Sequence, residues 1–205
     1  PQANQLVHPG YVYKIHATTV SSGDCVIRDC PGYARVIFGL SRPRKPILGT
    51  ELSGEVAAVG QSVTKYKVGD QVFALTGMKL GAHAEYINLP EKGVLTLKPG
   101  NASYIEAAAI AFGGTSALHF LRKGKIQSGK KVLIYGASGA VGTYAVQLAR
   151  YFGAEVTAVC STNNIDLVYF LGAHHAIDYV NEDFTKTQIT YDLIFDAVGK
   201  NKKLN

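Results

Sequence analysis

The stretch KVLIYGASGAVG, residues 131–142, is an apolar run that breaks into small residues and glycines. Val132–Tyr135 is apolar without alternation, as in a strand that is covered on both faces of a sheet. The residues that follow predict a helix over 140–152, because apolar side chains recur there at spacings of three and four. These side chains are Val141, Ala145, Leu148 and Phe152. A strand, a tight glycine turn and an amphipathic helix in this order are typical of a dinucleotide-binding turn.

The glycines of this turn match the pattern G-x-G-x-x-G at its second and third positions. The first position holds Ala137, whereas Gly139 and Gly142 occupy the other two. Gly139 would let the backbone approach a pyrophosphate, whose charge would lie on free N–H groups at the helix N-terminus. Gly142 would let the helix pack closely against the strand. The alternative interpretation is an ordinary strand-to-helix turn of an α/β protein.

The end of the next predicted strand, 155–160, bears on the choice of nucleotide. A site for NAD usually places an Asp or Glu there, about 20 residues beyond the glycines. This chain has Cys160-Ser-Thr-Asn-Asn164, where Ser161 and Thr162 can donate hydrogen bonds to a 2′-phosphate. NADP is therefore favoured over NAD. No Lys or Arg lies between Arg150 and Lys186, so the charged partner of a phosphate is missing from the expected place.

The pattern of apolar residues and turn signals changes near residue 105. Before it, short apolar runs alternate with turn signals, which predicts an all-β domain over residues 1–104. After it, helical and strand patterns alternate, which predicts a parallel sheet with right-handed crossovers over residues 105–205. The elements predicted in this second domain are helices over 105–122, 140–152 and 164–171 and strands over 131–135, 155–160, 175–178 and 191–198.

The composition restricts the class of protein and its partners. The chain has 205 residues, 47% hydrophobic, with a formal net charge of +6 that is spread along its length. The basic clusters carry no interleaved aromatics, so we expect a solvated surface and no nucleic-acid partner. The stretch 105–121 contains Glu106 and His119 and is not a clean membrane span, so no membrane partner is expected. The 3 cysteines form no paired framework, which favours a reducing compartment, and we expect a cytoplasmic protein.

A series of further motifs carries a family resemblance. In order they are LGTELSGEVAAVGQSVTKYKVGDQVFAL, GAHAEYINLP, the stretch from EAAAIAFGGTSAL to KVLIYGASGAVGTYAVQLAR, and GAHHAIDY followed by YDLIFDAVG. The chain resembles the zinc-independent quinone oxidoreductase branch of the medium-chain dehydrogenase/reductase superfamily. The resemblance implies an N-terminal GroES-like domain, a partly open β-barrel, joined to a Rossmann domain with a doubly wound parallel sheet.

The resemblance also allows the zinc positions to be tested. In the zinc alcohol dehydrogenases of this superfamily, a Cys precedes an Asp by three residues, and a Gly-His-Glu triplet supplies a second ligand. Here Ser21 precedes Asp24, and the triplet is Gly49-Thr50-Glu51. We therefore expect no metal, and we interpret His174 and His175 as surface or packing residues. Without a Lewis acid, oxidation of a simple alcohol lacks a means of lowering the pKa of its hydroxyl group.

The resemblance implies an NADPH-dependent reductase that transfers hydride to a quinone or an α,β-unsaturated carbonyl. Asp24 is the candidate catalytic residue in the substrate cleft, with an Asp that caps the local turn as the alternative. Arg28 and Tyr33 are further residues that can face the substrate. The candidate cofactor-binding residues are Thr115, Ser138, Gly139, Ala140, Val141, Gly142, Ser161, Thr162, Tyr179, Val198 and Gly199. Thr115 has helix-start capping as its alternative role, and Tyr179 has packing.

Members of this family continue well beyond the DAVG strand, whereas this chain ends in GKNKKLN. The expectation is therefore a Rossmann domain that is truncated at its C-terminus. Two hypotheses stay open: an active reductase of which this is a fragment, and a non-enzymatic, crystallin-like nucleotide-binding or inactive member of the same family. A homodimer is the usual assembly that the resemblance implies. A zinc alcohol dehydrogenase is disfavoured by Ser21 and Thr50.

Overall fold

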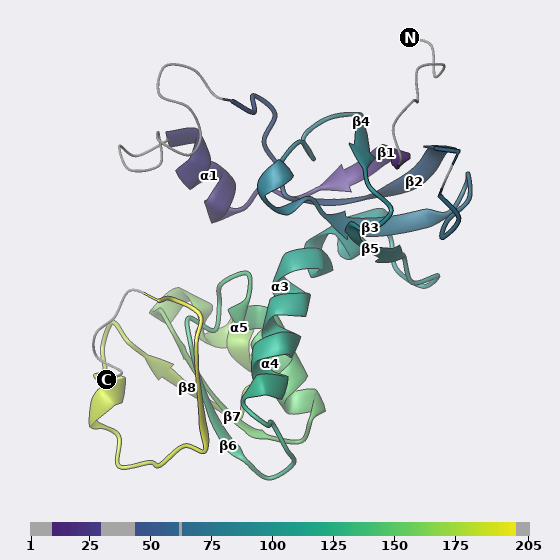
Figure 1. The fold of residues 1–205 in the computed structure, drawn as a ribbon. Helices are drawn as coiled ribbons and strands as arrows, with labels where there is room; N and C mark the ends of the chain where they lie inside the picture. Colours follow the sequence, from purple (N-terminus) through teal and green to yellow (C-terminus); the bar gives the residue numbers. More distant parts are fainter. Residues whose placement is uncertain (1–9, 30–43, 62, 200–205) are drawn as a thin grey trace. The chain divides into compact units, whose positions relative to one another are not determined.

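The computed structural model describes residues 10–29, 44–61 and 63–199 of the chain. The chain divides into two compact units, Pro1–Phe112 and Gly113–Asn205, each with its own sheet (Figure 1). The candidate residue Tyr33 lies outside the described residues.

The first unit is built on a five-stranded antiparallel sheet with the order β4-β1-β2-β3-β5. Its elements are β1 (Tyr11–Thr18), α1 (Ser22–Asp29), β2 (Glu51–Val59), β3 (Gln71–Leu75), the 3₁₀ turn η1 (Gly77–Lys79), β4 (Tyr86–Leu89) and β5 (Val94–Leu97). Side chains that alternate along the strands pack into one core, with Tyr11, Leu52, Val56 and Val72 fully buried. The antiparallel GroES-like sheet predicted for this part of the chain is confirmed.

The helix α1 corrects the all-β prediction for this unit. Ser21 and Asp24 form a reciprocal cap, in which the Ser21 N–H and hydroxyl both donate to Asp24 Oδ2, at 2.8 and 2.9 Å. The pattern Ser-x-x-Asp is a helix-start signal that the sequence carries at this position. The alternative role considered for Asp24, that of a local cap, is therefore present in the structure.

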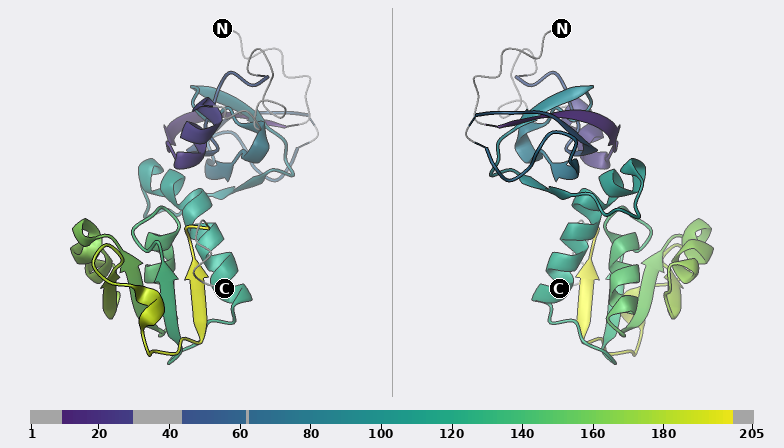
Figure 2. Two further views of the ribbon diagram at one scale, coloured as in Figure 1. Left: turned by 90° about the vertical axis from the view of Figure 1, so that its left-hand side faces the viewer. Right: turned by 90° about the vertical axis from the view of Figure 1, so that its right-hand side faces the viewer.

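The second unit contains a four-stranded parallel sheet with the order β8-β7-β6-β9. Its elements are β6 (Lys131–Tyr135), α4 (Gly142–Tyr151), β7 (Glu155–Cys160), η2 (Thr162–Asn164), α5 (Ile165–Phe170), β8 (His175–Asp178), η3 (Phe184–Lys186) and β9 (Leu193–Asp196). Figure 2 shows β9, in yellow, beside β6. Every predicted strand and helix of this unit is present, although α4, α5 and β9 begin and end inside their predicted bounds.

Both faces of the parallel sheet are covered, but unequally. One face packs on α3 (Tyr104–Lys123) and α4 through a large core that includes Leu121, Ile134 and Val146. The other face carries a smaller cluster of Leu133, Tyr135, Val159, Ile177 and Phe184. Val132–Tyr135 is therefore buried on both sides, as its continuous apolar sequence predicts.

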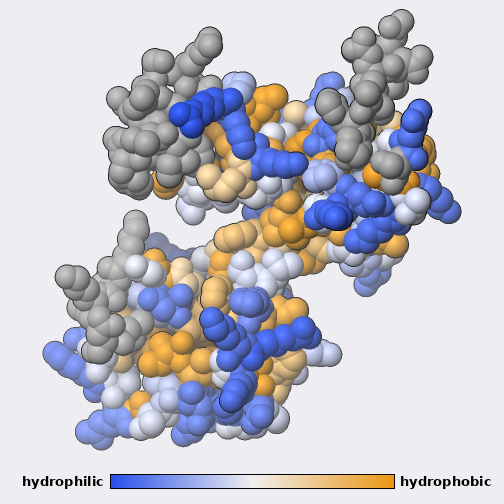
Figure 3. All heavy atoms as spheres, viewed as in Figure 1, coloured by the Kyte–Doolittle hydropathy of each residue, from blue (hydrophilic) through white to orange (hydrophobic). Residues whose placement is uncertain are grey.

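The helix α3 confirms the helix predicted over 105–122, and the border between the two units falls inside it, between Phe112 and Gly113. Its first residue, Tyr104, stacks on His16 with ring centroids 4.4 Å apart. Hydrophobic side chains lie along this helix in Figure 3, and Ile105 and Phe120 are exposed. Among the described residues, no helix is both long and apolar enough to cross a membrane.

Candidate nucleotide-binding site

The turn after β6 is formed by backbone contacts that only glycine permits. Gly136 has a positive φ of 78°, and its N–H and that of Ala137 both donate to Val159 O at 3.1 Å. A Cβ atom at Gly142 would lie 2.1 Å from Gly136 O. The turn therefore closes on itself, and Gly142 is required for this close approach. Ala137 is fully buried, so the first position of the glycine pattern accepts a methyl group here.

The start of α4 leaves main-chain donors without acceptors. Thr143 N–H donates to Gly139 O at 2.9 Å, but no acceptor within the described chain is paired with the N–H groups of Ala140, Val141 and Gly142. The residue before the helix, Val141, provides no side-chain cap. Unpaired N–H groups and the helix dipole together favour a bound anion such as a pyrophosphate.

Two other segments lie against this turn. A Cβ at Gly136 would meet the side chain of Val198 at 2.7 Å, which places Val198 at the glycine turn. The Val198 and Gly199 N–H groups are held by Asp196 Oδ1, at 2.8 and 3.0 Å. A Cβ at Gly113 of α3 would meet Ala140 O at 2.6 Å, so α3 also packs on the turn. Gly113 is a functional residue beyond those predicted, and the signal for it was the pair of glycines inside a predicted helix, which is typical of a close approach of this kind.

Thr115 lies in the middle of α3, so the alternative role of helix-start capping is wrong for this residue. The helix begins at Tyr104, where Ser103 and Glu106 form the cap: the Ser103 hydroxyl donates to Glu106 Oε2 at 2.8 Å. Thr115 is exposed, two residues beyond the glycine that contacts the turn. Its role beside the nicotinamide ribose stays a prediction.

The remaining candidates lie at the ends of β7 and β8. Ser161 follows β7 directly, and its hydroxyl accepts a hydrogen bond from Asn164 Nδ2 at 2.9 Å. Thr162 donates its hydroxyl proton to Asp178 Oδ2 at 2.6 Å. It therefore has no hydroxyl proton left for a phosphate, which corrects the expectation that both hydroxyls can donate. Tyr179 follows β8 and is half exposed.

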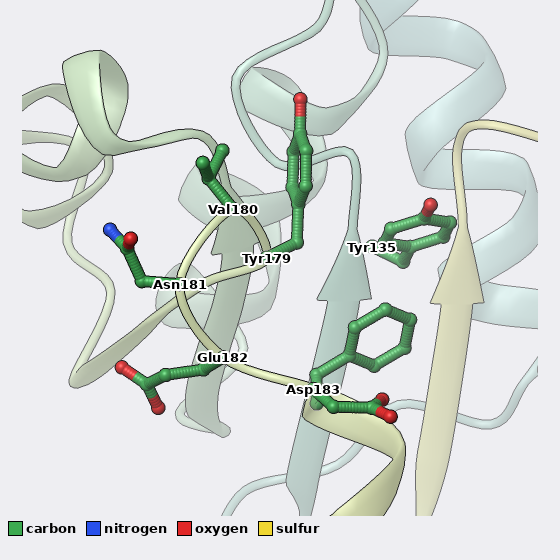
Figure 4. Close-up of a pocket in the computed structure, with 7 residues that line it drawn as sticks. Tyr135, Tyr179, Val180, Asn181, Glu182 and Asp183 are labelled. Atoms are coloured by element: carbon green, nitrogen blue, oxygen red, sulfur yellow. The ribbon is translucent and has the colours of Figure 1, made fainter.

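A cavity of about 310 Å³ opens at this edge of the sheet. It is lined by Tyr135, Tyr179, Val180, Asn181, Glu182, Asp183 and Phe184. In Figure 4 the hydroxyls of Tyr135 and Tyr179 point to the same side of the cavity, away from the carboxylates of Glu182 and Asp183. The carboxyl ends of parallel strands are where α/β sheets bind ligands. The Ser138–Gly142 turn, Ser161, Tyr179 and Val198 all lie at such ends.

In the first unit, Asp24 is a buried carboxylate whose two oxygens are both occupied. Besides the Ser21 donors on Oδ2, Gly49 N–H donates to Oδ1 at 3.1 Å. Burial alone would raise the pKa of Asp24, but the hydrogen bonds from Ser21 and Gly49 and the nearby His83 hold that pKa below its usual value. The carboxylate joins α1 to the segment before β2. Its role toward a substrate stays a prediction.

Glu51 is also buried, with its Oε2 accepting from Phe112 N–H at 3.3 Å. Burial raises the pKa of Glu51, and the negative charge of Asp24 acts in the same direction. The two neighbouring carboxyl groups of this unit therefore have pKa values shifted in opposite directions.

The residues at the zinc positions do not fit a zinc ion. Ser21 is engaged with Asp24, and Thr50 replaces an imidazole with a hydroxyl. Over residues 10–29, 44–61 and 63–199, no group of three or more His, Cys, Asp and Glu side chains is placed to hold a metal. His174 and His175 are both exposed: His174 Nδ1 accepts from Val156 N–H at 2.9 Å, and His175 lies 3.4 Å from Glu155.

Comparison with known families and proteins gives consistent matches. The model of the alcohol dehydrogenase GroES-like domain matches residues 10–99, and that of the zinc-binding dehydrogenases matches residues 140–205. The chain is 39% identical over 170 residues to the 2-methylene-furan-3-one reductase of Solanum lycopersicum, a match that covers 78% of this chain and 44% of the relative. The chain therefore spans about half the length of the curated relatives it matches.

Two solved structures are similar over both units. The quinone oxidoreductase of Coxiella burnetii superposes with a TM-score of 0.85 at 29% identity, covering 93% of this chain and 60% of that one. The Escherichia coli quinone oxidoreductase in complex with NADPH gives a TM-score of 0.74 at 27% identity, covering 86% and 52%.

Proposed function

Because the chain belongs to the medium-chain dehydrogenase/reductase superfamily, we propose that it acts as an NADPH-dependent reductase that transfers hydride to a quinone or an α,β-unsaturated carbonyl without zinc. The observation that carries this proposal is the set of unpaired N–H groups at the start of α4. The names of the relatives support it, since they include a furanone reductase and an NADPH-bound quinone oxidoreductase. The activity of the whole protein is part of the proposal, because the chain spans about half of those relatives.

The dinucleotide would lie along the carboxyl edge of the parallel sheet. The N–H groups of Ala140, Val141 and Gly142 would hold its pyrophosphate, and Ser161 and Tyr179 would face its adenosine end. Val198 would shape the surface near the glycine turn, and Thr115 would face the nicotinamide ribose. Bound NADPH would supply the hydride, which carries two electrons.

A quinone or an enone needs little further help from the protein. Its conjugated carbonyl delocalises the charge that the hydride brings, and one proton from an acid group or water completes the reduction. The chain then mainly orients the acceptor and excludes water from the reacting groups. Asp24 is the proposed polar group for the acceptor. Since it also holds α1 to Gly49, a substitution there tests the fold as well as the reaction.

The test is a titration of NADPH and of NADH into the 205-residue chain, with nicotinamide fluorescence as the signal. A benzoquinone and then an enone are added to the same sample. Saturable binding of NADPH with loss of signal only after an acceptor is added supports the reductase. Binding without turnover favours a non-enzymatic nucleotide-binding protein. No binding of either nucleotide overturns the proposal.

A further inference from the structure

One carboxylate joins the two loops at the adenosine end of the site. Asp178, the last residue of β8, is 9% exposed. Its Oδ2 accepts from the Thr162 hydroxyl at 2.6 Å and from Asn181 Nδ2 at 2.8 Å, and its Oδ1 accepts from Val180 N–H at 3.0 Å. A carboxylate offers about four lone-pair directions, and three are occupied here. Asp178 therefore has little capacity left to accept ribose hydroxyls directly.

The backbone fixes the same junction. The carbonyl of Asp178 accepts the N–H groups of Asn181 and Glu182, at 3.1 and 2.8 Å. Tyr179 N–H donates to Cys160 O at 3.1 Å, which extends the pairing of β8 with β7 by one residue. The Tyr179 side chain leaves the sheet at this point and lines the cavity (Figure 4).

The two neighbouring hydroxyls have opposite hydrogen-bonding roles. Thr162 gives its only hydroxyl proton to Asp178, so its oxygen can act toward a ligand only as an acceptor. Ser161 accepts from Asn164, which leaves its own proton available to a ligand. A ribose 2′-hydroxyl both donates and accepts, and it can satisfy this pair. A phosphate dianion has acceptors only and would gain one donor, Ser161.

The negative charge of Asp178 also favours a free 2′-hydroxyl over a 2′-phosphate at this junction. The Thr162 hydroxyl, together with Val180 N–H and Asn181, holds the pKa of Asp178 below its usual value, so the carboxylate is ionised at neutral pH. The sequence holds no Lys or Arg between Arg150 and Lys186 to offset this charge. A 2′-phosphate beside Thr162 would therefore meet a negative group, and the stretch between Arg150 and Lys186 supplies no cationic side chain to offset it.

We propose that Asp178 is a positioning residue that limits the preference for NADPH: by fixing Thr162 as an acceptor, it makes the site admit the free 2′-hydroxyl of NADH. This inference rests on the proposed function, because it assumes a dinucleotide at the glycine turn. Asp178 acts through Thr162, and Thr162 is the specificity-determining residue that faces the ribose.

The test compares dissociation constants of NADPH and NADH for the full chain and for the variants T162V, T162S and D178N. T162V removes the acceptor, so NADH should bind about fivefold more weakly, as expected for one hydrogen bond, while NADPH changes less than about twofold. T162S should restore NADH binding. D178N removes the charge, so NADPH should bind about two- to fivefold more tightly relative to NADH.

D166N is the matched control, since Asp166 is an exposed carboxylate on the neighbouring helix α5. This substitution should leave the ratio of the NADPH and NADH dissociation constants unchanged. If T162V weakens the binding of NADPH and NADH equally, the inference is overturned. This outcome does not depend on whether D178N disturbs the loops. Binding with the expected ratios but without turnover would leave this inference intact and contradict the proposed reductase. Failure of the wild-type chain to bind either nucleotide would overturn both.

Discussion

The two units differ in whether the polar groups at their candidate sites have hydrogen-bond partners. In the first unit, the carboxylates of Asp24 and Glu51 are buried and accept N–H groups of other segments, so they stabilise the fold. In the second unit, the backbone N–H groups of Ala140 and Val141 are left without partners at an accessible turn. The unpaired donors in this comparison therefore lie in the backbone of the second unit, whereas the buried carboxylates of the first unit serve as structural anchors.

The largest effect is expected for Gly142→Ala. The added Cβ would lie 2.1 Å from Gly136 O, so the turn must open. We expect a loss of about 3 kcal/mol in the free energy of unfolding of the second unit and loss of nucleotide binding. Urea unfolding and nicotinamide fluorescence measure the two effects. Gly100→Ala is the control, because nothing lies within 4 Å of a Cβ at that position; similar behaviour of both variants would contradict the backbone interpretation.

The next effect is expected for Asp24→Ala, which removes the cap of α1 and leaves Gly49 N–H buried without its acceptor. The free energy of unfolding of the first unit should fall by about 2 kcal/mol. Calorimetry that resolves the two units should show the change in the first only. If instead the melting profile is unaltered and only turnover falls, Asp24 acts on the substrate and is not a structural anchor.

A smaller, pH-dependent effect is expected for Glu51→Gln. The pKa of Glu51 is raised in the folded chain, so the protonated form favours folding. The stability that this group contributes is complete below its pKa in the unfolded chain, about 4.5, and is lost as the pH rises through its pKa in the folded chain. The wild-type chain should therefore lose up to about 1.4 kcal/mol per pH unit in this window, and the Gln variant should lose less. Urea unfolding from pH 4 to pH 8 measures both slopes.

The opposite sign is expected for Asp24, whose pKa is lowered: its contribution is present above the unfolded pKa and is lost as the pH falls through the folded value. Parallel slopes for the wild-type chain and the Glu51→Gln variant would show that Glu51 is not the titrating group.

The smallest effect is expected for His175→Ala. His175 lies 3.4 Å from Glu155, and both side chains are largely exposed. The free energy of unfolding should change by less than about 0.5 kcal/mol. His174→Ala should cost more, because it removes the acceptor of Val156 N–H. Thermal melting of the two variants side by side measures the difference, and an equal cost would contradict the surface assignment of His175.

Features set by local backbone preferences were predictable from the sequence, whereas contacts between distant side chains were not. The strand Val132–Tyr135 and the turn up to Gly142 were predictable, since continuous apolar residues and glycine act locally. The helix α1 was missed because it is short and has few apolar residues, although Ser21 and Asp24 carried its capping signal. The bond from Thr162 to Asp178 joins two strand ends and depends on which strands are neighbours. The Rossmann prediction makes these strands neighbours, but it does not show that these two side chains form a hydrogen bond at their ends.

The tight closure of the glycine turn has a consequence for how this sequence can diverge. Position 137 already carries a methyl group, so the turn forms there without a glycine. Position 142 has no such latitude, because every single-base change that replaces its glycine codon by another amino acid introduces a Cβ against Gly136 O. Among distant descendants of this gene, a glycine at position 137 is thus a poor marker of descent, whereas a glycine at position 142 is a good one.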